Sequence, residues 1–426
     1  MRGNWKSPLH QSAQARYNAS MQDIRADVQA LMEQNRRTAD GHIYTVPSPE
    51  LYPFQWLWDS CFHTIILSHF DTEAAKAELR SLCTHILPSG LIPHIIYWKH
   101  DVEVKNWGRE MRGDVINNAW GVEGTSAITQ PPLFALAAWR VYEQDGDTAF
   151  LKELYPIFKT HFNRLLAERR LNEESPLFII NPDESGEDNS PRFDTAQQLP
   201  PQHSTDQSLD RRLDRIYEHA KCDFDTKTCM AKHFAVADVP FNIIALEGLE
   251  YMARIAEVLA HEGDVHMFRK HHDTLQSVIM HTLCAQNECR SYDHLTNTYI
   301  DVDTWARFMP LYGGLLSKKE ARKLVDEHLK DADRFWSAFP VCTTARTESA
   351  FDALGGFWRG PIWFGPNWFI YKGLKRYGFD DVAEELKVKS IALIEKSGFR
   401  EQYHPDTGEG QGAHDFTWGG LVIDME

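Results

Sequence analysis

Apolar side chains recur at steps of three and four along most of the chain, which is the spacing of one face of an α-helix. Residues 12–35 are a clear case, because Met21, Ile24, Val28 and Leu31 follow one another at these steps. The same pattern predicts further helices from about residue 56 and from about residue 71, at 130–144, 147–170, 240–261, 264–283, 303–314, 317–330, 361–376 and 379–397, and a short one from about Thr417. Only residues 177–180 and 290–301 suggest short strands.

The predicted helices, about twelve in number, come in pairs that recur about every 50 residues without a close sequence repeat. Long connections follow at alternate junctions, among them 88–128, 181–194 and 398–416. This order predicts an all-α fold, an (α/α)₆ barrel whose long loops gather at one end and form a pocket. Length alone would suggest two or three domains. We instead expect a single domain over residues 1–426, with a loop-rich excursion at about 195–230.

Composition narrows the possible partners. The share of hydrophobic residues, 42%, is ordinary for a soluble globular protein, and the net charge of −16 argues against nucleic acid and anionic membranes. A small anionic substrate stays open, since it needs only one local basic site. No apolar signal core opens the chain and no apolar run approaches the length of a membrane span, so a cytoplasmic location is expected. The sequence does not say whether the chain forms a homo-oligomer.

Cysteines and potential metal ligands add little chemistry. Seven cysteines, an odd number without C-x-x-C spacing, indicate neither a disulfide framework nor a zinc site. No other cluster has metal-ligand spacing, so we expect neither a metal nor a cofactor. The thirteen tryptophans are more informative, because many lie beside polar residues. Flat rings that stack on sugar C–H faces, with polar groups that bind hydroxyls, would give this mixture, although core packing explains about half of them.

The most unusual stretch is residues 181–194, where five carboxylates fall within fourteen residues. Gly186 and Pro191 disfavour a helix here and favour a loop. Crowded carboxylates repel one another, so some must be paired, hydrogen-bonded or protonated. The stretch is either a solvated surface loop or, as we favour, a loop that presents one carboxylic acid as a catalyst and uses others to bind a polyhydroxylated ligand.

Four clusters of aromatic and polar residues follow the same theme, at 54–60, 129–132, 355–368 and 401–410. Asp59 could cap a helix or, between its tryptophans, accept sugar hydroxyls. Prolines place Gln130 at a helix start. Cleavage of a glycosidic bond needs a proton donor and a second carboxylate, about 6.5–9.5 Å apart in inverting enzymes. Asp188 and Glu401 could meet in this way across the mouth of a barrel.

Five motifs in order resemble glycoside hydrolase family 63, in particular its short bacterial members, which include mannosylglycerate and glucosylglycerate hydrolases. The resemblance spans about residues 50–425. The motifs are Trp56-x-Trp58-Asp59-Ser60, Gln130-Pro131-Pro132, Glu184-Ser185-Gly186-x-Asp188-Asn189-Ser190-Pro191-Arg192-x-Asp194, Trp358-Arg359-Gly360-Pro361-x-Trp363 and Glu401-x-Tyr403-x-Pro405-x-Thr407-Gly408.

The resemblance implies an (α/α)₆ barrel and hydrolysis of an α-glycoside with inversion, with Asp188 as general acid and Glu401 as general base. No cofactor takes part. It also implies a set of substrate-binding residues: Trp58, Asp59 and Gln130 around the sugar, Arg359 and Trp363 in the pocket wall, Tyr97 near the leaving group, and Glu184 and Tyr403 beside the catalytic pair.

The charges in the acidic stretch suggest how the general acid keeps its proton. Glu184, Glu187 and Asp194 would favour a proton on Asp188 by repulsion, and Arg192 would pair with Asp194.

The leading hypothesis is an inverting α-glycosidase for a small glucoside or mannoside, most of all glucosylglycerate or mannosylglycerate. A carboxylate on the substrate would need a basic partner, for which Arg211, Arg212 and Arg215 are candidates, although a solvated helix face explains them more simply. A sugar epimerase, which would need a histidine pair in the cavity, and a non-catalytic sugar-binding protein remain as alternatives.

Overall fold

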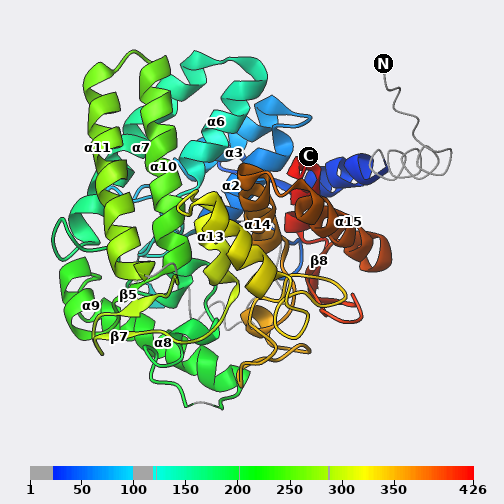
Figure 1. Cartoon of the computed structure of the whole chain (residues 1–426). Helices are drawn as coiled ribbons and strands as arrows, with labels where there is room; N and C mark the ends of the chain where they lie inside the picture. The colour runs from blue at the N-terminus through cyan, green and yellow to red at the C-terminus, as the bar shows by residue number, and fades with distance from the viewer. Residues whose placement is uncertain (1–22, 99–118, 121, 201, 286–287) are drawn as a thin grey trace.

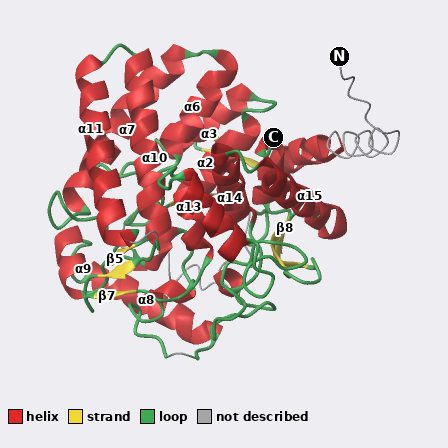
Figure 2. Cartoon of the chain, viewed as in Figure 1, coloured by secondary structure: helices red, strands yellow, loops and turns green. Residues whose placement is uncertain are grey.

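The computed structural model describes residues 23–98, 119–120, 122–200, 202–285 and 288–426. The part of the predicted first helix before residue 23, including Met21, and residues 99–118 of the predicted loop 88–128 lie outside these residues. In the described part, the predicted helix pairs are confirmed (Figures 1 and 2). The inner helices are α2 (Leu57–Leu67), α6 (Phe134–Asp145), α10 (Val239–Val258), α12 (Met309–Tyr312), α14 (Phe364–Tyr377) and the 3₁₀ helix η8 (Thr417–Asp424).

These six described inner helices form a closed ring. Each contacts the next along the chain, and η8 contacts α2 to close the circle. All residues of α2, α12 and η8 are buried, as expected for helices surrounded by protein on every side. The outer layer consists of helical residues 23–35, α3 (Thr72–Leu82), α7 (Thr148–Glu168), α11 (Glu262–Val278), α13 (Lys318–Leu324) and α15 (Asp380–Ser397). The predicted (α/α)₆ barrel is therefore confirmed.

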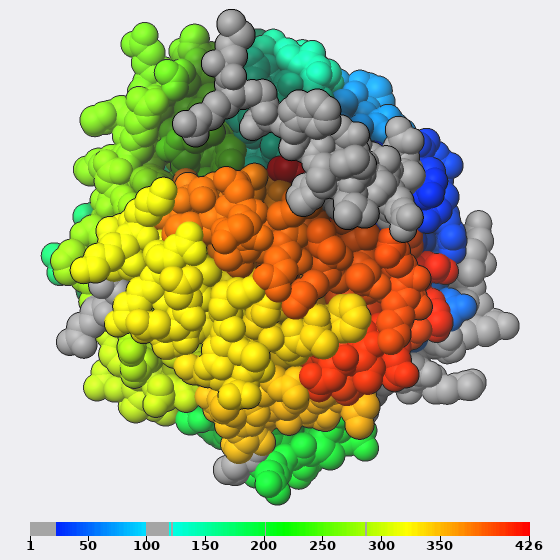
Figure 3. All heavy atoms as spheres, turned by 45° about the vertical axis from the view of Figure 1, so that its right-hand side comes forward, coloured from blue at the N-terminus to red at the C-terminus, as the bar shows by residue number. Residues whose placement is uncertain are grey.

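Long loops gather at one end of the barrel, the lower end in Figures 1 and 2. The excursion predicted as loop-rich lies there too, and much of it is helical, with α8 (Thr205–Ala220) and α9 (Thr226–Lys232). Helix α8 begins with a capping box between Ser204 and Gln207, and its sequence is mostly polar. Figure 3 shows the α8 region (green) beside the loops around residue 350 (gold) at this end.

Strands are few and short. The described ones are β1 (Arg36–Ala39) with β2 (His42–Thr45), β3 (Gln55–Trp56) with β4 (Ile95–Ile96), β5 (Val236–Ala237) with β6 (Tyr292–Asp293) and β7 (Thr298–Tyr299), and β8 (Arg400–Tyr403) with β9 (Gly410–His414), all antiparallel. The β8–β9 hairpin was not predicted from the sequence. Its glycines weaken the alternation that marks a strand.

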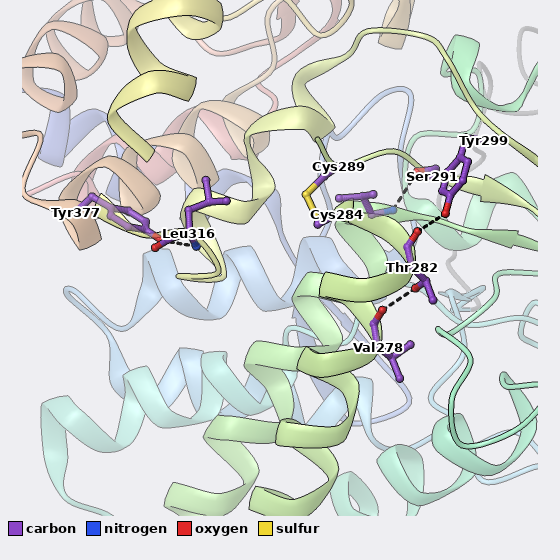
Figure 4. The surroundings of a disulfide bond; sticks show 9 residues. Val278, Thr282, Cys284, Cys289, Ser291, Tyr299, Leu316 and Tyr377 are labelled. Atoms are coloured by element: carbon purple, nitrogen blue, oxygen red, sulfur yellow. Dashed lines mark hydrogen bonds between the residues drawn. A yellow bond between two sulfur atoms is a disulfide. The ribbon is translucent and has the colours of Figure 1, made fainter. Parts of the chain in front are cut away.

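One disulfide departs from the expectation drawn from the cysteine count. Cys284 and Cys289 are bonded just after α11, whose last turn continues as the π-helical residues Ile279–Leu283 (Figure 4). Nearby, the Tyr299 hydroxyl donates to the carbonyl of Thr282 over 2.7 Å, which fixes the same turn to β7. None of the helices in the described residues combines the length and the apolar sequence that a membrane span needs.

Candidate active site

A cavity of about 100 Å³ lies at the loop end of the barrel. Its walls come from the first turns of α2 and η8, from the residues that lead into α6 and α14, and from the loops between helices. The lining residues are Pro47, Tyr52, Trp56, Trp58, Asp59, His94, Gln130, Asp183, Gly186, Asp188, Arg212, Phe357, Trp358, Trp363, Glu401, Phe416 and Trp418. Four of the sequence clusters and the acidic stretch thus contribute to one site.

Asp188 reaches this cavity from the loop that connects α7 to α8. Two short 3₁₀ helices, Pro182–Ser185 and Pro191–Phe193, hold the loop on either side of it. The Asp188 side chain is 33% exposed, and its Oδ2 lies 3.5 Å from Nη1 of Arg212. Gly186 adopts a left-handed φ of 75°, and a Cβ there would collide with the Trp58 ring, so only glycine lets this loop lie on the tryptophan.

Glu401 enters the same cavity from β8 and is 1% exposed. Its Oε1 accepts a hydrogen bond from the Tyr52 hydroxyl at 2.5 Å, and its Oε2 accepts one from the backbone N–H of Ala413 at 2.8 Å. The hairpin register shifts opposite Glu401, where Gly412 has φ of 66°. A Cβ on Gly412 would occupy the space of the Glu401 carboxylate. This β-bulge therefore forms the seat of the carboxylate.

Burial raises the pKa of Glu401 to about 7. The hydrogen bonds from Tyr52 and Ala413 favour the ionised form and act in the opposite direction, while the negative charge of Asp188 adds to the increase. A carboxylate with a pKa near neutrality can accept a proton and release it again at neutral pH, which suits a general base.

The rest of the cavity suits a sugar ring. Asp59 lies in the first turn of α2, where its Oδ1 accepts from the indole N–H of Trp418 at 2.7 Å, and burial raises its pKa to about 6. Gln130 Oε1 accepts from the backbone N–H of Trp58 at 3.3 Å and so ties the start of α6 to that of α2. The rings of Trp358 and Trp363 stack 4.1 Å apart, which makes a rigid aromatic wall.

Four residues expected to bind substrate do not line the cavity. Glu184 is fully buried and forms a two-bonded ion pair with Arg169, at 3.0 and 2.5 Å. The Tyr403 hydroxyl donates to the Gly398 carbonyl. Tyr97 packs edge-on against the Phe54 ring, and its hydroxyl accepts from Trp120. Arg359 binds both carboxylate oxygens of Asp194, at 2.9 and 2.7 Å.

The acidic stretch is largely neutralised by arginines, which corrects two expectations. Arg192 pairs with Glu187 and Asp238, not with Asp194. Glu184, Glu187 and Asp194 each have an arginine partner, so their repulsion does not supply the reason for a proton on Asp188.

Arg212 is the main residue that sequence reasoning undervalued. The solvated-face interpretation is wrong for it, because its side chain is only 14% exposed and lines the cavity. Its Nε donates to Asp183 Oδ2 at 2.9 Å. Burial would lower the pKa of Arg212, but Asp183 and Asp188 outweigh this effect and raise it. The sequence around Arg212 does not distinguish it from Arg211 and Arg215, because all three arginines of α8 stand among mostly polar residues.

Two further lining residues bring polar atoms to the cavity beside Arg212. In the described part of the chain, Nδ1 of His94 and Oδ1 of Asp183 have no hydrogen-bond partner. Burial, with the charge of Arg212, keeps the pKa of His94 well below its usual value, so the ring is neutral. Tyr52, just before the cluster 54–60, and Trp418, eight residues after the last cluster, also line the cavity and were not predicted. The described residues contain no group of three or more side chains suited to hold a metal ion.

Comparison with known proteins agrees with this geometry. The family model for a mannosylglycerate hydrolase MGH1-like glycoside hydrolase domain matches residues 52–419. The chain belongs to this glycoside hydrolase family. As a member it is a hydrolase of glycosidic bonds and, as its motifs predicted, a short representative of family 63.

Individual members of the family are similar over nearly the whole chain. The mannosylglycerate hydrolase of Thermus thermophilus is 29% identical, over 91% of this chain and 96% of its own. The glucosylglycerate hydrolase of Mycolicibacterium hassiacum is 28% identical, over 89% and 93%. A crystal structure of a family 63 mannosylglycerate hydrolase from Thermus thermophilus in complex with Tris and D-glycerate superposes with a TM-score of 0.84 at 28% identity, covering 94% of this chain and 99% of that one.

Proposed function

We propose that this glycoside hydrolase cleaves the α-glycosidic bond of glucosylglycerate or mannosylglycerate with inversion of configuration. Asp188 is the general acid and Glu401 the general base. The observation that supports the substrate class is the position of Arg212, the one lysine or arginine among the described residues that line the cavity. It lies beside Asp188, where the leaving group must be when Asp188 protonates its oxygen.

The reaction has a simple proton balance. Asp188 gives its proton to the glycosidic oxygen, and Glu401 takes a proton from the water that attacks the anomeric carbon on the other face of the sugar. Trp58, Asp59, Gln130 and Trp363 hold the sugar ring during this exchange. The products are the free sugar in the inverted anomeric form and glycerate.

The residues outside the cavity have a positioning role in this proposal. Glu184 and Arg359 hold the loop of Asp188 through their ion pairs, Tyr403 fixes the β8–β9 hairpin, and Tyr97 supports the wall around β4. None of the four contacts the sugar.

The test is a substrate comparison with purified protein. Glucosylglycerate, mannosylglycerate and glucosylglycerol are incubated with the enzyme, and the released sugar and its first anomer are read by proton NMR. Cleavage of a glycerate compound with the inverted anomer first, and a preference over glucosylglycerol of at least about tenfold in kcat/KM, is expected. Asp188→Asn and Glu401→Gln should each lose at least about 10²-fold in kcat. Near-normal turnover in either variant would remove the assigned role.

The two alternatives receive less support from the site. An epimerase needs paired histidines, and among the described lining residues His94 is the one histidine. A non-catalytic binding protein would not need the seat that holds Glu401. The same NMR experiment separates them, because an epimerase releases no glycerate and a binding protein changes nothing.

A cytoplasmic location stays a prediction of the sequence, and the oligomeric state stays open. The Cys284–Cys289 bond does not favour this location, because disulfides are rare in reducing compartments.

A further inference from the structure

A second cavity adjoins the leaving-group side of the active site. Its volume is about 220 Å³, against about 100 Å³ for the first. One water needs only about 15 Å³ of such space. The second cavity is therefore large enough for a small organic molecule. Asp188, Arg212 and Phe357 line both cavities. The two cavities are therefore neighbours, and these three side chains lie between them.

The walls of the second cavity mix polar and apolar groups. Hydroxyl and amide side chains come from Asn189, Ser190, Gln197, Thr205 and Ser208, and apolar ones from Phe193, Leu199, Leu209 and Phe357. Ser190 is 1% exposed, and its hydroxyl has no hydrogen-bond partner among the described residues. A buried hydroxyl without a partner is uncommon in proteins and points to a group that is supplied by a ligand or by water.

The charges of the second cavity disfavour an anionic occupant. Arg212 is the one basic side chain among its described lining residues, and in the proposed function it binds the carboxylate of the glycerate unit in the first cavity. The remaining charged group, Asp194, is paired with Arg359. Hydroxyls, amides and half-buried leucines together suit a neutral molecule with many hydroxyls and apolar C–H faces.

We infer that the second cavity binds a neutral sugar or polyol unit at the far end of the leaving group. The inference rests on the proposed function, in which the first unit of the leaving group lies beside Arg212. A longer leaving group continues past Arg212 and Phe357 and places its second unit between α8 and the loop 188–199. The enzyme then accepts glycosides of extended aglycones as well as those of glycerate.

The experiment compares two substrates that differ only in this second unit. One is glucosylglycerate, and the other is the same compound with a further glucose on the free hydroxyl of its glycerate. Leu209→Trp on α8 and Leu199→Trp in the preceding loop each fill the second cavity from a different element. Asp206→Trp is the matched control, because Asp206 is exposed on α8 and lines neither cavity.

The wild-type enzyme is expected to release the first sugar from both compounds with similar or higher kcat/KM for the longer one. Each filling variant should lose at least about tenfold on the longer compound and less than about threefold on the shorter one, and the control should change neither. Two independent filling variants guard against misfolding of one of them, which circular dichroism would reveal.

Three results would overturn the inference. Cleavage of the short compound alone by the wild type would show that the second cavity takes no extension, while leaving the proposed function intact. Equal losses on both compounds in folded filling variants would show that the second cavity does not distinguish them. Cleavage of neither compound would remove the proposed function and this inference with it.

Discussion

At the scale of single residues, the pKa of Glu401 results from two opposing effects of its surroundings. Its environment removes water, which favours the neutral form, but supplies two hydrogen bonds that favour the charged form. The balance leaves a pKa of about 7. Because burial opposes ionisation of this group, the side chain reduces the stability of the fold as pH rises through about 7.

The pH profile follows from this balance. We expect kcat/KM to rise with pH through about 7, because Glu401 must be ionised to accept a proton. Tyr52→Phe removes a hydrogen bond to the ionised form, so the rising limb should move to higher pH. Tyr155→Phe, remote from the cavity and bonded to Asp264, is the control and should leave the limb in place. An unchanged limb in Tyr52→Phe would contradict this account of Glu401.

The stability of Glu401→Gln should depend on pH in the corresponding sense. The raised pKa of Glu401 means that the wild type loses stability as pH rises from about 4.5 through about 7, which the variant does not. The melting temperature of the variant, relative to wild type, should therefore increase between pH 5 and pH 8. A difference that stays constant over this range would show that the buried carboxylate is not protonated at pH 5.

Gly186 offers a test of close packing. Gly186→Ala forces a Cβ into the Trp58 ring and into a left-handed φ of 75°, so we expect a loss of about 1–3 kcal/mol in stability and a lower kcat/KM. Gly146→Ala is the matched control, because Gly146 has φ of 68° but nothing within 4 Å of an added Cβ. Both variants are compared by thermal unfolding and by kinetics. Equal losses in the two variants would mean that the left-handed backbone conformation, and not the contact with Trp58, causes the effect.

At the scale of elements, buried ion pairs fix the loop of Asp188 to the barrel. Glu184 joins the first 3₁₀ helix of the loop to Arg169 at the end of α7 and accepts the backbone N–H of Thr129, which precedes Gln130. Arg359 joins the second half of the loop to the segment before α14. Residues of the acidic stretch that lie outside the cavity thus help to hold Asp188, which lines it.

Loss of one partner of such a pair should be costly. Arg169→Met leaves Glu184 fully buried without a counter-charge, and we expect a loss of about 3–5 kcal/mol in the free energy of unfolding. The double variant Arg169→Met/Glu184→Gln should recover part of the lost free energy of unfolding, because it removes the unpaired charge.

The control is Arg80→Met, which breaks an exposed pair with Glu153 and should cost less than about 1 kcal/mol. Denaturant unfolding measures all three, and equal costs for the two arginines would refute the role given to Arg169.

The β8–β9 hairpin illustrates what the sequence could and could not indicate about an element. The motif around Glu401 singled out this carboxylate, which lines the cavity, because the residue types of the motif stand next to one another in the chain. The bulge that seats the carboxylate depends on Gly412, eleven residues later, and on a register shift that no periodic pattern reports.

At the scale of the whole molecule, the ring of inner helices closes through the C-terminal η8. Asp424, near its end, receives hydrogen bonds from Trp368 of α14 and His69 after α2, and pairs with Arg140 of α6 and Lys372 of α14. Burial alone would raise the pKa of Asp424, but these partners outweigh it and lower the pKa well below its usual range.

Ring closure can be tested through this residue. Asp424→Asn leaves two cations without their carboxylate, so we expect a loss of about 3–5 kcal/mol at pH 7. Because the folded pKa is lowered, the stabilisation is present above about pH 4 and disappears as pH falls below it. Asp380→Asn, in an exposed pair with Lys375, is the control. If the difference in unfolding free energy between the variant and the wild type does not decrease at acid pH, the stabilisation does not come from the charge of Asp424.

The sequence by itself determined the helix pairs, the segments that line the cavity and most of the aromatic wall, because each of these depends on residues close together in the chain. Periodicity marks a helix, and a motif marks a loop. Only the tertiary structure decided which charges meet. Arg212 faces the cavity while Arg211 and Arg215 bind Glu218, and Glu184 and Arg359 face away from it. A buried charge needs a partner brought by another element, and no local pattern specifies that partner.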